Sequence, residues 1–140
     1  MTTAIDTNVL VALWDEDTRM NTTARQALDS AQAQGSLVVA GAVYAELLAL
    51  PGRTEMMLDT FFARTRIRID WEPGEGVWRA AGRAFQGHVG RRRATKPESP
   101  RRILADFIIG AHASFHRYRL LTLDHRHYRA AFPKLEVITL

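Results

Sequence analysis

The sequence predicts an α/β fold with a central parallel sheet of about five strands. Short apolar runs alternate along the chain with longer segments whose apolar residues recur at helical spacing, and this alternation is typical of a parallel sheet. The 140 residues, 46% of them hydrophobic, suffice for the core of one compact domain, which we expect to span residues 1–140. No internal repeat or low-complexity tract indicates a second domain.

The expected strands are short runs rich in valine, leucine and isoleucine. In chain order they are residues 3–6, 36–40, 66–69, 120–123 and 136–138. Segments of helical period fill the gaps between them, so we expect the strands to run parallel.

The expected helices lie between these strands. They are residues 8–14, 18–34, 42–50, 54–65, 76–89 and 103–117, with a short last helix from about His125. Two of them end at clear stop signals, because Gly35 suits the left-handed residue that closes a helix and Pro51 cannot continue one. The helix at 103–117 carries Phe107 and Ala111 on one apolar face, as a helix packed on a sheet does.

Composition and missing motifs exclude several kinds of protein. The chain has no cysteine, so disulfides, zinc-thiolate sites and thiol nucleophiles are excluded, and a reducing cytoplasm fits best. The motifs G-x-S-x-G, G-x-G-x-x-G and the P-loop are also absent, which argues against acyl transfer, dinucleotide redox chemistry and nucleoside-triphosphate hydrolysis. The longest uncharged apolar run, residues 37–45, is far below the roughly 20 residues that span a bilayer, so we expect no membrane segment.

Positive charge is concentrated in one stretch of an arginine-rich chain. The net charge is +4 and the pI is about 10.1, which suits a polyanionic partner. Six basic residues meet a single acid, Glu98, in this stretch, and they are Arg91, Arg92, Arg93, Lys96, Arg101 and Arg102. Pro97 and Pro100 predict a break between helices there. The stretch is either a contact surface for RNA phosphates or a solvated loop.

Four acids interrupt apolar segments at corresponding places in the predicted fold. Asp6 ends a predicted strand and Asp124 follows one, whereas Glu46 and Asp106 lie early in helices, so all four belong at the carboxyl edge of the sheet. Taken singly, each has a structural explanation, such as a helix cap for Asp6 or a first-turn acid for Asp106. Together, converging carboxylates indicate a site for a hard divalent cation, Mg²⁺ or Mn²⁺.

Around these acids the chain resembles the PIN-domain family, and more narrowly the VapC toxins of VapBC toxin-antitoxin pairs. The segments IDTNVLVALW, VYAEL, ILADFIIGAHA and LLTLD are similar, in order, to the four acidic motifs of that family. The resemblance runs from about residue 3 to residue 138. It implies a three-layer α/β/α sandwich and a metal-dependent endoribonuclease that cleaves RNA, with transfer or ribosomal RNA as expected substrates.

The resemblance also implies roles for individual residues and partners. Asp6, Glu46, Asp106 and Asp124 match the metal-binding catalytic acids, and Thr7, Asn8 and Thr122 match supporting polar residues. Some relatives carry a further acid where this chain has Arg126, which bears on how a second metal is held. The expected partners are a VapB-type antitoxin, an RNA substrate and a second copy of the chain in a homodimer, all in the cytoplasm.

Two other functions and three other residue groups compete with this interpretation. A haloacid-dehalogenase-like phosphatase also has an aspartate after its first strand, but Asn8 stands where its second aspartate belongs; a non-catalytic RNA-binding module is the other alternative.

His112 and His116 have zinc-binding spacing without the glutamate of H-E-x-x-H, so we do not expect them to bind metal. We expect His125 and His127 on the surface, with a contact to RNA as the alternative. The tryptophans, residues 14, 71 and 78, are expected in the core or at a dimer surface, with base stacking as the alternative.

Overall fold

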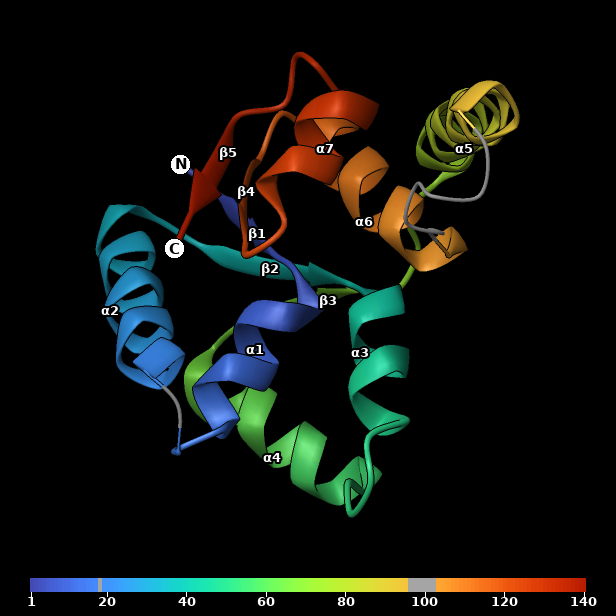
Figure 1. The fold of residues 1–140 in the computed structure, drawn as a ribbon. Coiled ribbons are helices and arrows are strands. Elements are labelled where there is room, and N and C mark those ends of the chain that lie inside the picture. Colours follow the sequence, from blue (N-terminus) through green and yellow to red (C-terminus); the bar gives the residue numbers. More distant parts are fainter. Residues whose placement is uncertain (18, 96–102) are drawn as a thin grey trace.

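The computed structural model describes residues 1–17, 19–95 and 103–140, and its centre is one five-stranded sheet (Figure 1). The strand order is β3-β2-β1-β4-β5, and every pair of neighbours is parallel. The strands are β1 (Thr3–Ile5), β2 (Leu37–Ala40), β3 (Arg68–Asp70), β4 (Arg119–Thr122) and β5 (Val137–Thr139). The predicted parallel sheet is therefore confirmed.

Helices cover both faces of this sheet. They are α1 (Thr7–Trp14), α2 (Arg19–Gln34), α3 (Gly41–Leu48), α4 (Glu55–Thr65), α5 (Glu75–Thr95), α6 (Leu104–Phe115) and α7 (His125–Ala131). Figure 1 shows α1 to α4 on one side of the sheet and α5 to α7 on the other, which is the expected α/β/α sandwich. No helix among the described residues is both long and apolar enough to cross a bilayer.

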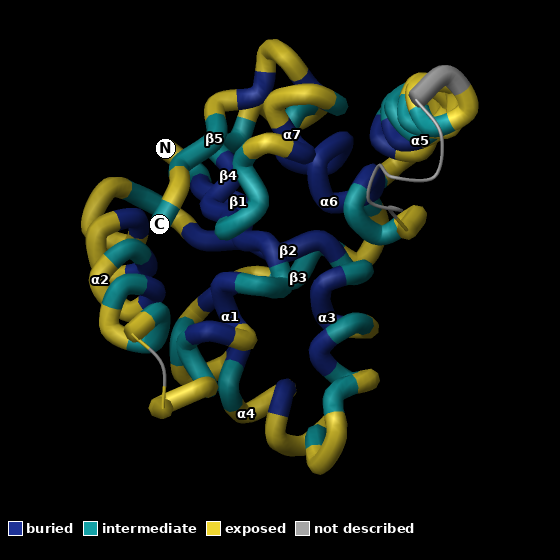
Figure 2. The backbone as a smooth tube through the Cα atoms, in the orientation of Figure 1, coloured by how far each residue is buried: buried dark blue, intermediate teal, exposed yellow. Residues whose placement is uncertain are grey.

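The core lies on both faces of the central strands. All residues of β1 and β2 are buried, as expected for parallel strands enclosed by helices on both sides. In Figure 2 the buried segments form a continuous band through the sheet and the inward sides of the helices. In α6 the whole run from Phe107 to Ala113 is buried, so this helix crosses the interior and not the surface.

Most boundaries lie within two residues of the predicted ones, and two of the differences have identifiable reasons. Strand β3 begins at Arg68 instead of residue 66, because Arg66 adopts a left-handed conformation (φ 58°) that closes α4. Helix α5 ends at Thr95 instead of residue 89, so Arg91, Arg92 and Arg93 are helical. Arginine favours helices, and basic residues complement the carboxyl end of a helix dipole. Lys96, Arg101 and Arg102 lie outside the described residues.

Candidate metal-binding active site

The carboxyl edge of the sheet brings the four predicted acids to one cavity. Asp6 follows β1 and Asp124 follows β4, and these strands are neighbours in which Ile5 is paired with Leu121. Glu46 comes from α3 and Asp106 from the first turn of α6. All four line a cavity of about 520 Å³, together with Thr7 and Asn8.

Asp6 is the most enclosed of these acids. Only 5% of its surface is exposed, and the Thr122 hydroxyl donates a hydrogen bond to its Oδ2 over 2.7 Å. The same hydroxyl oxygen accepts the backbone N–H of Asp124 over 2.9 Å, so Thr122 links the two strand-end acids. Asp6 occupies the N-cap position of α1 but makes no capping hydrogen bond with its side chain. A capping role therefore does not account for this buried carboxyl.

Thr7 and Asn8 hold other parts of the cavity in place. The Thr7 hydroxyl donates to Oε1 of Glu46 over 2.6 Å, which orients a carboxylate from a different helix. The Asn8 side-chain oxygen accepts the backbone N–H of Leu123 over 3.2 Å. That contact fixes the segment that leads from β4 to Asp124. Thr7 thus contacts an acid directly, whereas Asn8 contacts the backbone beside one; their supporting role stays a prediction.

Asp106 and Asp124 also occupy helix N-termini. Oδ2 of Asp106 accepts the backbone N–H of Ile103 over 3.3 Å, which is the first-turn role that the sequence suggested. Asp124 stands at the N-cap of α7 without a capping hydrogen bond from its side chain. A carboxylate has two oxygens, so the contact with Ile103 leaves Asp106 able to act as a ligand as well.

The electrostatics of the cavity favour a cation. Burial raises the pKa of Asp6 to about 6; the hydrogen bond from Thr122 opposes this shift, and repulsion by Asp106 adds to it. Burial also raises the pKa of Glu46, against the hydrogen bond from Thr7 and with further repulsion by Asp106. Charged carboxylates are thus disfavoured next to one another here. Their all-oxygen donor set fits a hard divalent ion such as Mg²⁺ or Mn²⁺.

Sequence reasoning missed Tyr128 on α7. This residue is fully buried beside Asp6, and its hydroxyl lowers the pKa of that carboxyl although it lies outside ordinary hydrogen-bond geometry. Burial and the neighbouring carboxylates raise the pKa of Tyr128, so the phenol stays protonated. The sequence offered one sign that Tyr128 lies near the acids, because it comes four residues after Asp124 on a predicted short helix.

His127 corrects a sequence expectation. It is buried instead of lying on the surface, and its ring meets Phe107 edge to face with centroids 5.2 Å apart. The reason is that α7 packs against the interior through the side chains of His127 and Tyr128. Gly110 of α6 allows this packing, since a Cβ there would overlap the ring of Phe132.

The tryptophans and the described arginines of the basic stretch do not line the cavity. Trp14 packs edge to face on Phe61 as expected for core packing. Trp71 and Trp78 are exposed, which excludes the core for them, and the dimer surface or base stacking stays a prediction. Arg91 and Arg93 are exposed near the end of α5, and neither lines the acidic cavity.

The sequence matches the PIN-domain family model over residues 3–133. The chain belongs to the PIN-domain family. The predicted resemblance to that family is therefore confirmed over nearly the whole chain. Because VapC-type PIN domains are nucleases, membership supports a hydrolase that acts on nucleic acid. No curated protein is significantly similar to the chain.

Solved structures of the same fold include several toxin-antitoxin complexes. VapBC2 from Rickettsia felis, bound to a DNA fragment from the promoter of its genes, has a TM-score of 0.74 at 16% identity, covering 99% of this chain and 98% of that one. VapBC-1 from nontypeable Haemophilus influenzae reaches 0.68 at 18% identity with the same coverage. FitAcB from Neisseria gonorrhoeae reaches 0.67 at 20% identity, covering 98% and 96%. At these identities the likeness establishes the fold.

Proposed function

We propose that this PIN-domain protein is a divalent-metal-dependent endoribonuclease, the VapC-type toxin of a toxin-antitoxin pair. The observation that carries the proposal is the convergence of Asp6, Glu46, Asp106 and Asp124 on one cavity. Four carboxylates in a PIN-domain chain match the ligand set that phosphodiester hydrolysis with Mg²⁺ or Mn²⁺ requires.

The residues of the cavity have distinct roles in this proposal. The four acids would hold the ion, Thr122 fixes the relative position of Asp6 and Asp124, and Thr7 orients Glu46. When bound, the ion activates a water and neutralises charge that develops on the phosphoryl oxygens. The protonated Tyr128 beside Asp6 supplies positioning and does not add negative charge.

RNA is the proposed substrate, with transfer or ribosomal RNA as the expected class. The arginine-rich composition and the exposed Arg91 and Arg93 on α5 support binding to a phosphate backbone. Lys96, Arg101 and Arg102 extend this charge along the sequence. Such contacts set affinity and carry little sequence information, so the choice of RNA depends on its shape and loops.

The proposed partners are a VapB-type antitoxin and a second copy of the chain, in the cytoplasm. Support for the antitoxin comes from structural neighbours that were solved as VapBC complexes from Rickettsia felis and Haemophilus influenzae. An antitoxin that covers the acidic cavity would keep the nuclease inactive until it is removed.

Expression in cells followed by mapping of new RNA ends tests the proposal. Parent protein should produce new ends at defined sites, whereas Asp6→Asn should produce none. Asp29→Asn is the matched control, because it removes an exposed acid of α2 that does not line the cavity. Absence of new ends with folded parent protein would contradict the proposal. Hydrolysis of small phosphate esters would then favour the phosphatase, and RNA binding without cleavage would favour the non-catalytic module.

A further inference from the structure

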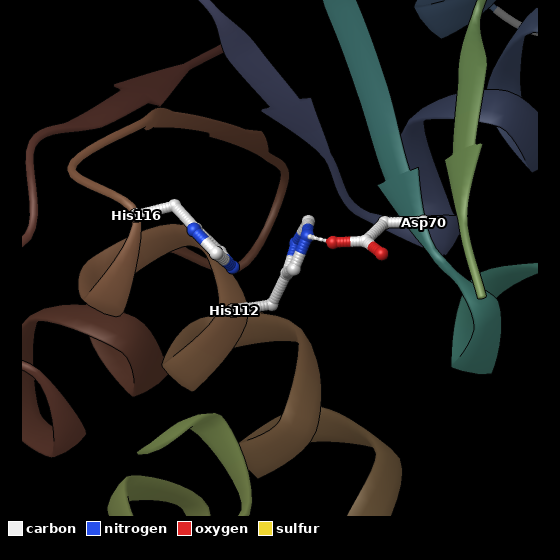
Figure 3. Close-up of side chains that lie close together, drawn as sticks. All are labelled: Asp70, His112 and His116. Atoms are coloured by element: carbon white, nitrogen blue, oxygen red, sulfur yellow. Dashed lines mark hydrogen bonds and ion pairs between the residues drawn. The ribbon is translucent and has the colours of Figure 1, made fainter. Parts of the chain in front are cut away.

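A second group of metal-binding side chains lies outside the acidic cavity. Asp70 ends β3, and His112 and His116 stand one turn apart on α6; one potential ligand atom from each lies within 4.8 Å of the others (Figure 3). None of these three residues lines the acidic cavity. The i, i+4 spacing of the histidines thus gains a third ligand from a distant strand.

We propose that Asp70, His112 and His116 form a binding site for a transition-metal ion of the zinc class. Two imidazoles and one carboxylate are donors that suit Zn²⁺, whereas Mg²⁺ prefers oxygen ligands alone. Three protein ligands leave a fourth tetrahedral position open to water or to a partner's side chain. The site does not depend on the proposed ribonuclease function.

The separations of the ligand atoms suit a small ion. Nitrogen and oxygen ligands about 2.1 Å from zinc lie roughly 3.4 Å apart in a tetrahedron. Nε2 of His112 is 3.0 Å from Oδ2 of Asp70, and the full set spans no more than 4.8 Å. The required separation falls between these two values, so small side-chain rotations bring all three atoms to an ion.

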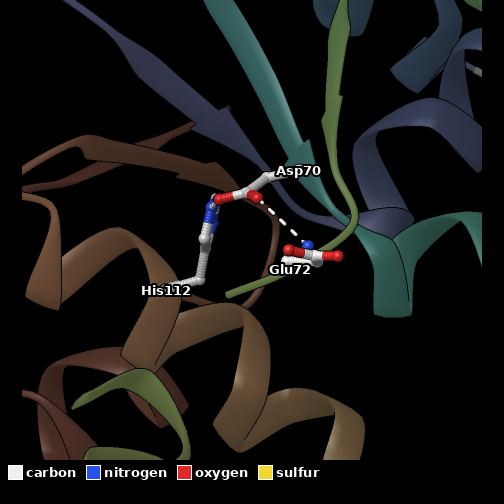
Figure 4. Close-up of polar contacts among 3 residues, drawn as sticks. All are labelled: Asp70, Glu72 and His112. Carbon is white, nitrogen blue, oxygen red and sulfur yellow. Dashed lines mark hydrogen bonds and ion pairs between the residues drawn. The ribbon is translucent and has the colours of Figure 1, made fainter. Parts of the chain in front are cut away.

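Surrounding contacts hold the ligands in suitable orientations. The backbone N–H of Glu72 donates to Oδ1 of Asp70 over 3.3 Å, which leaves Oδ2 directed at His112 (Figure 4). The His116 ring stacks on Tyr118 with centroids 5.3 Å apart and planes 20° from parallel. Such supporting contacts are typical of metal sites, because they fix ring and carboxylate orientation before the ion arrives.

The surroundings of His112 also suit a ligand. This side chain is only 1% exposed, and burial lowers its pKa against the opposing effect of Asp70. Metal ions bind neutral imidazole. Arg68 also lowers the pKa of His112, and its charge opposes a cation, but the arginine is exposed and therefore screened by solvent.

The competing explanation is a purely structural hydrogen bond. In that case Asp70 satisfies the buried His112 and connects α6 to β3, and the position of His116 has no role. The two explanations differ in what His116 does. If the site binds a metal ion, replacing His116 weakens ion binding; if Asp70 and His112 form only a structural hydrogen bond, replacing His116 has no such effect.

Calorimetric titration of the whole protein with Zn²⁺, in saturating Mg²⁺ to occupy the acidic cavity, tests the proposal. Parent protein should bind one Zn²⁺, and His116→Ala and Asp70→Asn should each weaken binding at least about tenfold, the lower bound for losing a supporting contact. His88→Ala, which removes a histidine of α5 outside the cluster, should bind like the parent. Asp106→Asn should also keep the site, which separates it from the acidic cavity.

A spectroscopic reading keeps the test valid if a variant is less stable. Co²⁺ bound to the parent should give the visible absorption of tetrahedral nitrogen and oxygen ligation, and the band should disappear in His116→Ala. Zn²⁺ affinity and Co²⁺ spectra that are the same in parent and His116→Ala would overturn the proposal. Failure of Zn²⁺ to bind the folded parent would do so as well and would leave the structural hydrogen bond.

Discussion

Thr122 connects the two acids that follow neighbouring strands. Its hydroxyl donates to Asp6 and accepts from the backbone N–H of Asp124, so one small side chain sets the relative position of two proposed ligands. The Thr7 hydroxyl donates to Glu46, an acid from another helix. At this scale the arrangement of the proposed ligands depends on hydroxyl groups as well as on carboxylates.

Thr122→Val should weaken Mn²⁺ binding by about tenfold or more, because outer-shell contacts of metal sites typically contribute that much. The change keeps the shape of the side chain but removes both hydrogen bonds. Thr3→Val is the matched control: Thr3 is a buried threonine of β1 whose hydroxyl accepts from Arg119 at the other end of the strand. Calorimetric titration measures both. Equal Mn²⁺ affinities in Thr122→Val and Thr3→Val would show that Thr122 does not support metal binding.

The raised pKa of Asp6 predicts how the metal-free protein responds to pH. A carboxyl whose pKa rises from 3.8 to about 6 on folding binds its proton more tightly in the folded state. Its contribution to stability is therefore complete below pH 4 and is lost as the pH rises through about 6. The loss amounts to about 3 kcal/mol at 1.36 kcal/mol per pKa unit.

Asp6→Asn isolates this contribution, since asparagine does not titrate. Unfolding by urea in EDTA, between pH 4 and pH 7, should show the parent losing stability relative to the variant as the pH rises. Above pH 6 the variant should be as stable as the parent or more stable. If Asp6 served as a helix cap instead, its charged form would stabilise α1 and the trend would have the opposite sign.

Helix packing determines how closely α7 approaches the acidic cavity. Gly110 of α6 lies against Phe132 and Tyr128, with no room for a side chain. We expect Gly110→Ala to destabilise the protein by about 1–3 kcal/mol, as overpacking of a core does. Gly82→Ala, at an open helical position of α5, should instead be neutral or stabilising by up to about 1 kcal/mol. Equal effects in thermal or urea unfolding would contradict this packing.

Helix α5 carries the three consecutive arginines at its carboxyl end. If they contact RNA phosphates, changing Arg91, Arg92 and Arg93 to glutamate should weaken binding to many RNAs alike. The slope of log affinity against log salt should fall by about 2, at roughly 0.7 per phosphate contact on single strands. Filter binding or fluorescence anisotropy with metal-free protein measures this slope. An unchanged slope would assign these arginines to solvent or to the antitoxin.

The order and type of most elements could be predicted from the sequence, whereas several boundaries could not. Apolar runs and helical spacing identify all five strands and seven helices of the described chain. The sequence does not reveal that Arg66 would take a left-handed conformation, or that α5 would continue through a glycine and three arginines. Both outcomes depend on differences in conformational free energy of about 1 kcal/mol, which are too small to predict from residue patterns.

At the scale of the whole molecule, topology explains why one candidate site was predictable and the other was not. In a parallel sheet the carboxyl ends of strands meet at one edge, so Asp6 and Asp124 were expected to converge although 117 residues lie between them. No such rule brings Asp70 to His112, because their meeting depends on how α6 crosses the sheet towards β3. The proposed third ligand for the histidine pair is therefore apparent only in three dimensions.

The central claim is that the acidic cavity holds the ion that drives RNA cleavage. The most direct measurement is the initial rate of cleavage of one mapped RNA as a function of Mn²⁺ concentration, with the parent and with Glu46→Gln. We predict no cleavage in EDTA, recovery on addition of Mn²⁺, and a half-saturating concentration at least about tenfold higher for the variant. A parent rate that persists in EDTA, or identical metal dependence in parent and Glu46→Gln, would contradict the account.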